Sequence, residues 1–283
     1  MSPHEIPGIC TIGIIVTTCI YSGIGFKNPA FRDKHLFSVP EILAEKEYHR
    51  VFTSALLHAD FNHLLLNMFS LFLFGRSIES DLGAGKFLLI YLVSVLGGSV
   101  LALWIHRHHE YKAYGASGGV CGVIFSYIIL FPGSSIMMFP VPFWIPAWLY
   151  AILFIVGSTI SLRRQADNIG HDAHLGGAII GFWFTAALVP DAVRAQPKLF
   201  LAISILAVLL FIFLLKMPLY LPLRAFVTEW QPREKIQEEK PSQNDEKELD
   251  AILEKISRKG IQSLSRREKK ILDAASKKRR EKS

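Results

Sequence analysis

Long apolar segments separated by short polar ones fill the first three quarters of the chain. They fall near residues 6–26, 55–74, 86–106, 117–131, 143–162, 173–189 and 199–217. A helix needs about 20 apolar residues to cross the hydrocarbon core of a bilayer. No long segment alternates with period two, as the strands of a membrane barrel would. The pattern therefore predicts an all-α, polytopic helical membrane protein with seven spans.

Charged residues concentrate behind the last apolar segment. The chain is 51% hydrophobic and 19% charged, whereas a soluble domain is about a quarter charged. Residues 219–283 hold 17 of the 31 Lys and Arg residues and 12 of the 24 Asp and Glu residues. Three cysteines without a CxxC pair indicate neither a disulfide framework nor a zinc site. We expect a six-helix core at 1–192, a seventh membrane helix at 193–218 and a charged basic tail at 219–283.

The tail has a pattern of its own. A turn-rich linker at 240–245 precedes apolar residues on one helical face at 249–256, and Gly260 ends that segment. Ser265 and Glu268 form a capping box that would open a second helix. We expect a short helical hairpin; the alternative is a mostly disordered tail. The basic tail could contact anionic lipid or another protein. It lacks the interleaved aromatic residues of a base-stacking surface, so nucleic acid is not expected as a partner.

Two polar side chains lie one turn apart in the second apolar segment. The string His63-Leu-Leu-Leu-Asn67 places an imidazole and an amide on the same helical face. Both groups can donate hydrogen bonds to a developing oxyanion. The alternative is an interhelical polar clamp, which is common in membrane bundles. Polar groups at membrane depth normally face the protein interior or water, so a functional site is expected here.

A serine between glycines opens the fourth apolar segment. In Gly115-Ala-Ser117-Gly118-Gly119, Ser117 would stand in the first turn of a helix, where free N–H groups favour negative charge. The string fits the nucleophile elbow of soluble hydrolases, but that turn requires a preceding strand and a sheet, which this chain does not offer. The alternative is a small-residue packing motif, Gly118-x-x-x-Gly122, with Ser117 as a bystander.

A histidine opens the sixth apolar segment in a similar setting. His174 is followed by Gly177-x-x-x-Gly181, and its helix would run in the same direction as the helix of Ser117. Close packing through these glycines would bring Ser117 and His174 within hydrogen-bonding reach. Asp172 lies two positions earlier, about 200° around a helix, so we do not expect it to orient His174.

These groups together predict acyl-transfer chemistry. Ser117 would be the nucleophile and His174 the general base of a Ser–His dyad. The backbone N–H of Ser117, with His63 and Asn67, would stabilise the oxyanion.

The motifs resemble those of the rhomboid family of intramembrane serine proteases. The similarity rests on three strings in the expected order: His63-x-x-x-Asn67, Gly115-Ala-Ser117-Gly118 and Ala173-His174-x-x-Gly177. Two further strings extend it over residues 45–190: Thr53-x-x-x-x-His58 and Gly75-x-x-x-Glu79-x-x-x-Gly83. The resemblance implies a six-helix core that water enters from one face. It also implies cleavage of transmembrane helices of other proteins, without metal or cofactor.

The resemblance also implies residue roles. Ser117 would be the nucleophile and His174 the base, with His63 and Asn67 as oxyanion partners. Supporting roles are expected for Gly115, Gly118, Gly177, Gly181, His58, Arg50 and Glu79. The chain departs from the family at two places. His49-Arg50 replaces a frequent Trp-Arg pair, and Cys121 replaces a Tyr that packs on the catalytic histidine, so the ring of His174 must be held otherwise.

The loop charges and the resemblance disagree about the orientation in the membrane. The loops that would share a side with the tail carry more Lys and Arg than those opposite: 27–54, 107–116 and 163–172 against 75–86, 132–142 and 190–198. The positive-inside rule places the first group in the cytoplasm, whereas the family usually opens its active site outside. We expect a bacterial plasma membrane protein with the core oriented as in the family. Either the tail is then extracytoplasmic or the last apolar segment does not cross.

The leading hypothesis is an intramembrane serine endopeptidase that acts on transmembrane protein substrates within the lipid bilayer. An inactive rhomboid-like chaperone or trafficking factor would keep the fold and lose Ser or His, but both are present. A small-molecule transporter would have an internal repeat in corresponding halves, and the sequence has no such repeat.

Overall fold

The computed structural model describes residues 8–108, 110–137, 143–164 and 170–216, together with 252, 254–256, 258 and 265. The chain forms two compact units, residues 1–221 and 222–283. The described elements of the first unit are, in order, α1 (Ile9–Lys27), α2 (Pro29–His35), β1 (Phe37–Ser38), α3 (Val39–Leu43), α4 (Arg50–Thr53), the 3₁₀ helix η2 (Ser54–Leu56), α5 (Phe61–Leu82), α6 (Ala84–His106), β2 (Lys112–Ala113), α7 (Ser117–Leu130), β3 (Ser135–Met137), β4 (Trp144–Pro146), α8 (Ala147–Arg164), α9 (His171–Leu188), α10 (Pro190–Ala195) and α11 (Pro197–Lys216).

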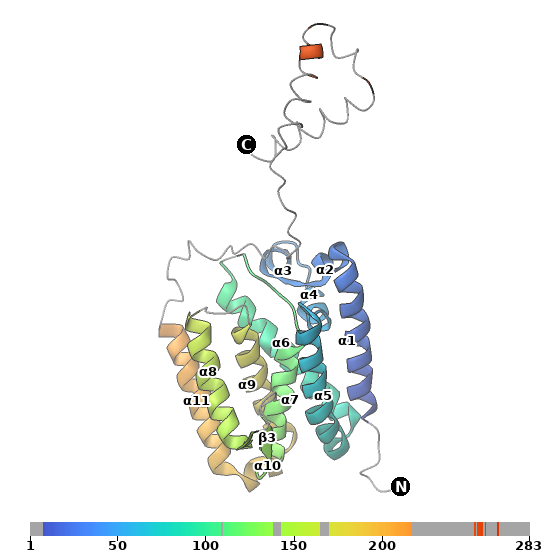
Figure 1. Cartoon of the computed structure of the whole chain (residues 1–283). Helices are drawn as coiled ribbons and strands as arrows, with labels where there is room; N and C mark the ends of the chain where they lie inside the picture. Colours follow the sequence, from blue (N-terminus) through green and yellow to red (C-terminus); the bar gives the residue numbers. More distant parts are fainter. Residues whose placement is uncertain are drawn as a thin grey trace. The chain divides into compact units, whose positions relative to one another are not determined.

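These helices confirm the predicted helical, polytopic class. The helices α1, α5, α6, α7, α8, α9 and α11 overlie the seven predicted apolar segments. Among the described residues, α1, α6 and Pro197–Leu214 of α11 are long and apolar enough to cross a membrane, while Ser117–Leu130 and Ala147–Leu162 form shorter apolar helices. Figure 1 shows α1 at one edge of the first unit and α11 at the opposite edge, beside α8.

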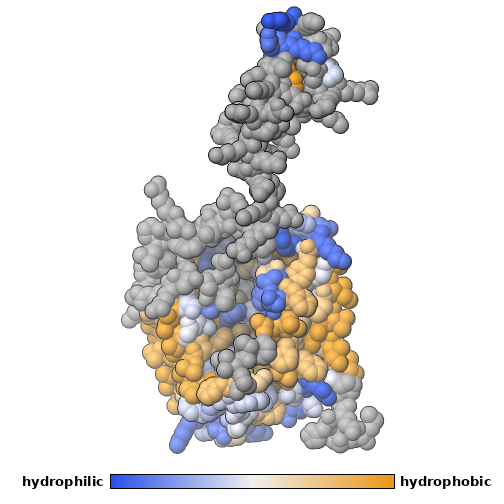
Figure 2. Space-filling model, viewed as in Figure 1, coloured by the Kyte–Doolittle hydropathy of each residue, from blue (hydrophilic) through white to orange (hydrophobic). Residues whose placement is uncertain are grey.

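The outer faces of the helices are apolar, as expected for an integral membrane protein. Figure 2 shows apolar side chains along both flanks of the first unit and polar ones gathered at its lower end. Large exposed apolar side chains include Ile20 of α1, Phe69 of α5 and Phe211 of α11. In water such a surface would be costly, whereas lipid solvates it.

The interior is built around α6, α7 and α9, which pack against one another. The phenylalanines Phe87, Phe125 and Phe182 come one from each of these helices and are fully buried. Nearly every residue of α7 is buried, so α7 is the central helix rather than a lipid-facing one. Its short, glycine-rich sequence suits that position because small side chains allow close helix contact.

Two predicted helix starts differ from the structure. The second predicted segment begins at residue 55, but α5 begins at Phe61, because the Asp60 side chain accepts the His63 N–H at 2.9 Å and caps the helix. The fifth predicted segment begins at residue 143, but Trp144–Pro146 pairs as a strand with Ser135–Met137 and α8 starts at Ala147. Hydropathy marks apolar residues without telling a strand from a helix over such short stretches.

The long loop before α5 is folded. It contains α2, α3 and α4, and its strand β1 pairs antiparallel with β2, which lies just before α7. The Ser38 hydroxyl donates to the Glu41 carboxylate at the start of α3, and this hydrogen bond lowers the pKa of Glu41. The β1–β2 pair therefore ties this loop to the segment that leads into Ser117.

The second unit is described at only a few positions. Residues 252, 254–256 and 258 are helical, Ile252 is buried, and Glu254 pairs with Arg258 at 2.7 Å. The rest of the predicted hairpin lies outside the described residues, and the predicted boundaries at 192 and 218 stay predictions.

Candidate active site

Ser117 is the first residue of α7 and follows a turn that is fixed from both sides. Gly115 has φ +145°, a backbone conformation that favours glycine. Its N–H donates to the Ser54 carbonyl at 3.0 Å, and the Ala116 N–H donates to His58 Nε2 at 3.3 Å. The segment around η2 thus sets the direction in which α7, and with it Ser117, begins.

His58 is buried and links this turn to α1. Because Nε2 accepts the Ala116 N–H, a neutral His58 carries its proton on Nδ1. Nδ1 lies 3.1 Å from Ser22 Oγ of α1, which donates its own proton to the Leu56 carbonyl at 2.8 Å. These hydrogen bonds connect the turn before Ser117 to α1 through His58.

The helices that carry Ser117 and His174 touch through their backbones. A Cβ added at Gly177 of α9 would meet the carbonyl oxygen of Gly118 and lie 3.0 Å from its Cα. A Cβ at Gly118 would lie 3.2 Å from the Ala173 carbonyl oxygen, and one at Gly181 would lie 2.6 Å from the Cα of Gly122. The glycine spacing therefore produces the close α7–α9 contact that the sequence predicts.

This contact places the two proposed catalytic residues on adjoining first turns. Gly118, which follows Ser117, meets Ala173, which precedes His174. Both Ser117 and His174 are half-buried.

His63 of α5 approaches the turn before Ser117, and Asn67 lies one helical turn further along α5. A Cβ at Gly115 would lie 3.3 Å from His63 Nε2 and 3.5 Å from Ser117 Oγ, so both polar groups border the same small space. Asn67, which is 7% exposed, donates one amide N–H to the His63 carbonyl at 2.9 Å. An amide nitrogen carries two hydrogens, so Asn67 has a second one to donate.

The ring of His174 has aromatic neighbours from two helices. Its centroid lies 6.4 Å from that of Phe154 in α8 and 5.8 Å from that of His171, one turn earlier in α9. Phe154 in turn stacks with Tyr150 at 5.8 Å. Because Cys121 stands where the family often has a tyrosine, the sequence did not indicate which side chain packs near the His174 ring. Phe154 is a large side chain near that ring, and no sequence motif marks it.

Asp172 does not share this environment. Its carboxylate pairs with His106 Nε2 at 3.0 Å and accepts from the Tyr111 hydroxyl at 3.3 Å. The Asp172 side chain therefore points away from the His174 side chain, as expected for residues two positions apart in a helix. Sequence patterns gave no indication of the partners His106 and Tyr111.

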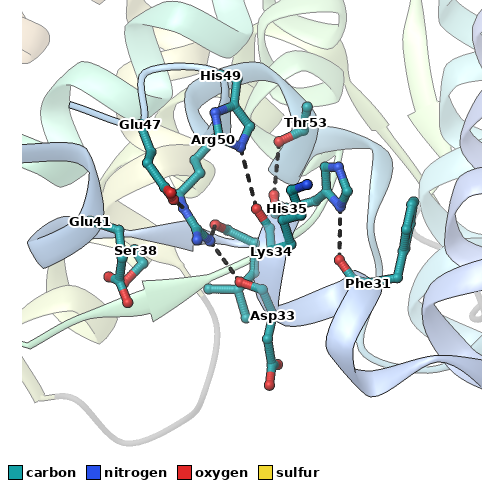
Figure 3. Close-up of polar contacts among 11 residues, drawn as sticks. Phe31, Asp33, Lys34, His35, Ser38, Glu41, Glu47, His49, Arg50 and Thr53 are labelled. Carbon is teal, nitrogen blue, oxygen red and sulfur yellow. Dashed lines mark hydrogen bonds and ion pairs between the residues drawn. The ribbon is translucent and has the colours of Figure 1, made fainter. Parts of the chain in front are cut away.

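Arg50 and Glu79 make their contacts in parts of the fold other than the segment around Ser117. The Arg50 guanidinium donates to the carbonyls of Asp33 and Leu36 at 2.7 and 2.9 Å and pairs with Glu47, so it closes the folded loop shown in Figure 3. In the same view, His49 approaches the Lys34 carbonyl, 3.3 Å from its Nε2.

Glu79 is buried near the beginning of α1. It accepts the backbone N–H groups of Cys10 and Thr11, both at 2.8 Å, and the Thr11 hydroxyl at 2.7 Å. It thereby satisfies donors at the first turn of α1, where helix N–H groups have no partner of their own.

Among the described residues, no group of three or more His, Cys, Asp or Glu side chains could hold a metal ion. The Ser117 hydroxyl and the His63 ring border the same small space. A hydroxyl and an imidazole are groups that suit acyl transfer.

Comparison with known proteins gives two family matches. The Rhomboid domain model matches residues 45–191, more than half of the chain. A second model, described as a family of unknown function, matches residues 234–278 in the tail.

Several curated proteins are similar over the same part of the chain. The mitochondrial Rhomboid protein 1 of Saccharomyces cerevisiae is 31% identical over 48% of this chain and 41% of its own length. Rhomboid protease GluP of Bacillus subtilis is 30% identical over 59% of this chain and 31% of its own length. Putative rhomboid protease YdcA of the same organism is 34% identical over 50% of this chain and 67% of its own length. The chain thus spans less than half the length of the yeast protein and of GluP. Since these relatives come from mitochondria and bacteria, the similarity assigns no particular membrane.

Proposed function

The chain belongs to the rhomboid family, and on that basis we propose that it is a serine endopeptidase that cleaves transmembrane segments of other membrane proteins. The observation that carries the proposal is the backbone contact between α7 and α9. This contact brings the first turn of α7, which begins with Ser117, next to the first turn of α9, which contains His174. Both side chains are half-buried.

In the first step, Ser117 Oγ attacks the carbonyl carbon of the scissile peptide bond while His174 takes the serine proton. The carbonyl oxygen gains a negative charge as the tetrahedral intermediate forms. The free N–H groups at the start of α7, the second amide hydrogen of Asn67 and the His63 ring donate to this oxygen.

In the second step, the peptide C–N bond breaks and His174 returns its proton to the leaving amine. This leaves an acyl ester on Ser117. Water then attacks the ester carbonyl, His174 takes a proton from that water and passes it to Ser117 Oγ, and the new carboxyl end is released. The dyad ends each cycle in its starting state.

The substrates in this proposal are transmembrane proteins that meet the enzyme in the bilayer. We propose a bacterial plasma membrane as its location, in the orientation usual for the family, with the basic tail in contact with anionic lipid or another protein. An inactive rhomboid-like binding factor is the second candidate, because family membership does not require activity. The presence of both Ser117 and His174 favours the protease.

The test is cleavage of a model transmembrane substrate by the purified full chain in liposomes. Ser117→Ala and His174→Ala are compared with wild type. Ser77→Ala in α5 and His108→Ala near the end of α6 are matched controls of the same residue types. We expect both dyad variants to lose cleavage and both controls to retain it. Cleavage that survives Ser117→Ala would refute the assignment.

A further inference from the structure

Three side chains form a polar cluster behind the first turn of α9. The Asp172 carboxylate, only 2% exposed, lies 3.0 Å from His106 Nε2 and 3.3 Å from the Tyr111 hydroxyl. The His106 and Tyr111 rings stack with centroids 3.8 Å apart and planes within 3°. The stack presents both donors to the same carboxylate.

We propose that Asp172, held by His106 and Tyr111, is a positioning residue for His174. The inference rests on the proposed protease function and deepens it, because it assigns a role to a carboxylate that does not touch the dyad. Asp172 acts through the first turn of α9, which it fixes two residues before His174.

The cluster joins the segments that carry the two halves of the dyad. His106 ends α6, Tyr111 lies in the segment that leads to Ser117, and Asp172 precedes His174 in α9. The Tyr111 carbonyl also accepts the Val39 N–H at 3.1 Å. A shift of Asp172 would therefore move His174 relative to the segment that leads from Tyr111 to Ser117.

The charge of the carboxylate adds a second effect. Burial and the adjacent Asp172 carboxylate raise the pKa of Tyr111 well above its usual value, so the phenol keeps its proton and donates it. A buried carboxylate is tolerated when it has such partners. Asp172 is also within electrostatic range of His174. Its negative charge stabilises the imidazolium that forms when His174 takes the Ser117 proton, without the direct contact of a triad.

Three variants of the full chain test the inference. Asp172→Asn removes the charge at constant size, and Tyr111→Phe removes one hydrogen bond while keeping the ring stack. Asp191→Asn is the control, because Asp191 is an exposed carboxylate that pairs with Arg194 three residues later. For each, kcat and KM are measured on a model transmembrane substrate. The kcat is expressed per active site, from the end point of fluorophosphonate labelling, and thermal unfolding is recorded beside it.

We expect Asp172→Asn to lower kcat per active site by about 10- to 100-fold, the scale of a misplaced catalytic group. Tyr111→Phe should lower it by a smaller factor, with KM nearly unchanged in both and Asp191→Asn equal to wild type. A lower unfolding temperature with unchanged kcat per site would mean a merely structural role and would overturn the inference. If Asp172→Asn does not fold, Tyr111→Phe decides on the same criterion.

The same experiment separates this inference from the proposed function. If the wild type cleaves the substrate and the Asp172 and Tyr111 variants have the same kcat per active site, only the inference is overturned. Wild type that neither cleaves nor is labelled overturns the proposed function and the inference with it.

Discussion

Replacement of Gly177 by alanine tests whether the α7–α9 contact sets the geometry of the dyad. A Cβ at this position would meet the carbonyl oxygen of Gly118, with the Gly118 carbonyl carbon at 2.6 Å and its Cα at 3.0 Å, whereas ordinary contacts begin at 3.4 Å. Backbone atoms cannot rotate away as the end of a side chain can. The two helices must therefore separate, by roughly 1 Å.

The separation has two measurable consequences. A misplacement of about 1 Å can lower the rate by about 10²-fold, so kcat should fall on that scale. Overpacking lowers the free energy of unfolding by about 1–3 kcal/mol. The better helix propensity of alanine offsets about 0.5–1 kcal/mol of this loss. The unfolding temperature should therefore fall as well.

The assay is cleavage of the model substrate, with thermal unfolding of the same preparations in detergent. Gly13→Ala in α1 is the matched control, because a Cβ there meets nothing within 4 Å. It should leave kcat unchanged. If Gly177→Ala kept wild-type kcat and unfolding temperature, the backbone contact would not set the dyad geometry and the reasoning would fail.

Two further predictions concern α5. Asn67→Ala should lower kcat by about 10²–10³-fold with little change in thermal unfolding, because it removes an oxyanion donor; unchanged turnover would rule out that role. Glu79→Gln should destabilise the fold by about 1–3 kcal/mol, since an amide cannot accept at both atoms from the Cys10 and Thr11 donors. Thermal unfolding checks this against Glu45→Gln, an exposed carboxylate, and equal losses in the two variants would contradict it.

Sequence patterns predicted the parts of the fold that depend on local periodicity. Apolar segments located the long helices, and the spacing of Gly177 and Gly181 predicted the contact of α9 with α7. The two-residue offset of Asp172 from His174 predicted that its carboxylate faces elsewhere. Each of these depends on helix geometry, which one segment of sequence contains.

The remaining features depend on contacts between distant segments. Phe154 approaches His174 only because α8 packs beside α9, and no motif marks it. The Asp172 partners, His106 and Tyr111, come from the end of α6 and the loop after it. Gly98 of α6 lies against Ala173, where a Cβ would be 2.6 Å from the carbonyl oxygen. No spacing of residues along the chain predicted that α6 packs against α9.

The most direct test of the central claim is covalent labelling of the wild-type protein with a fluorophosphonate, with the modified residue located by mass spectrometry. We expect one label, on Ser117, and a rate of labelling that falls sharply in His174→Ala because the serine loses its base. Labelling at another serine, or an equal rate on Ser117 without His174, would contradict it.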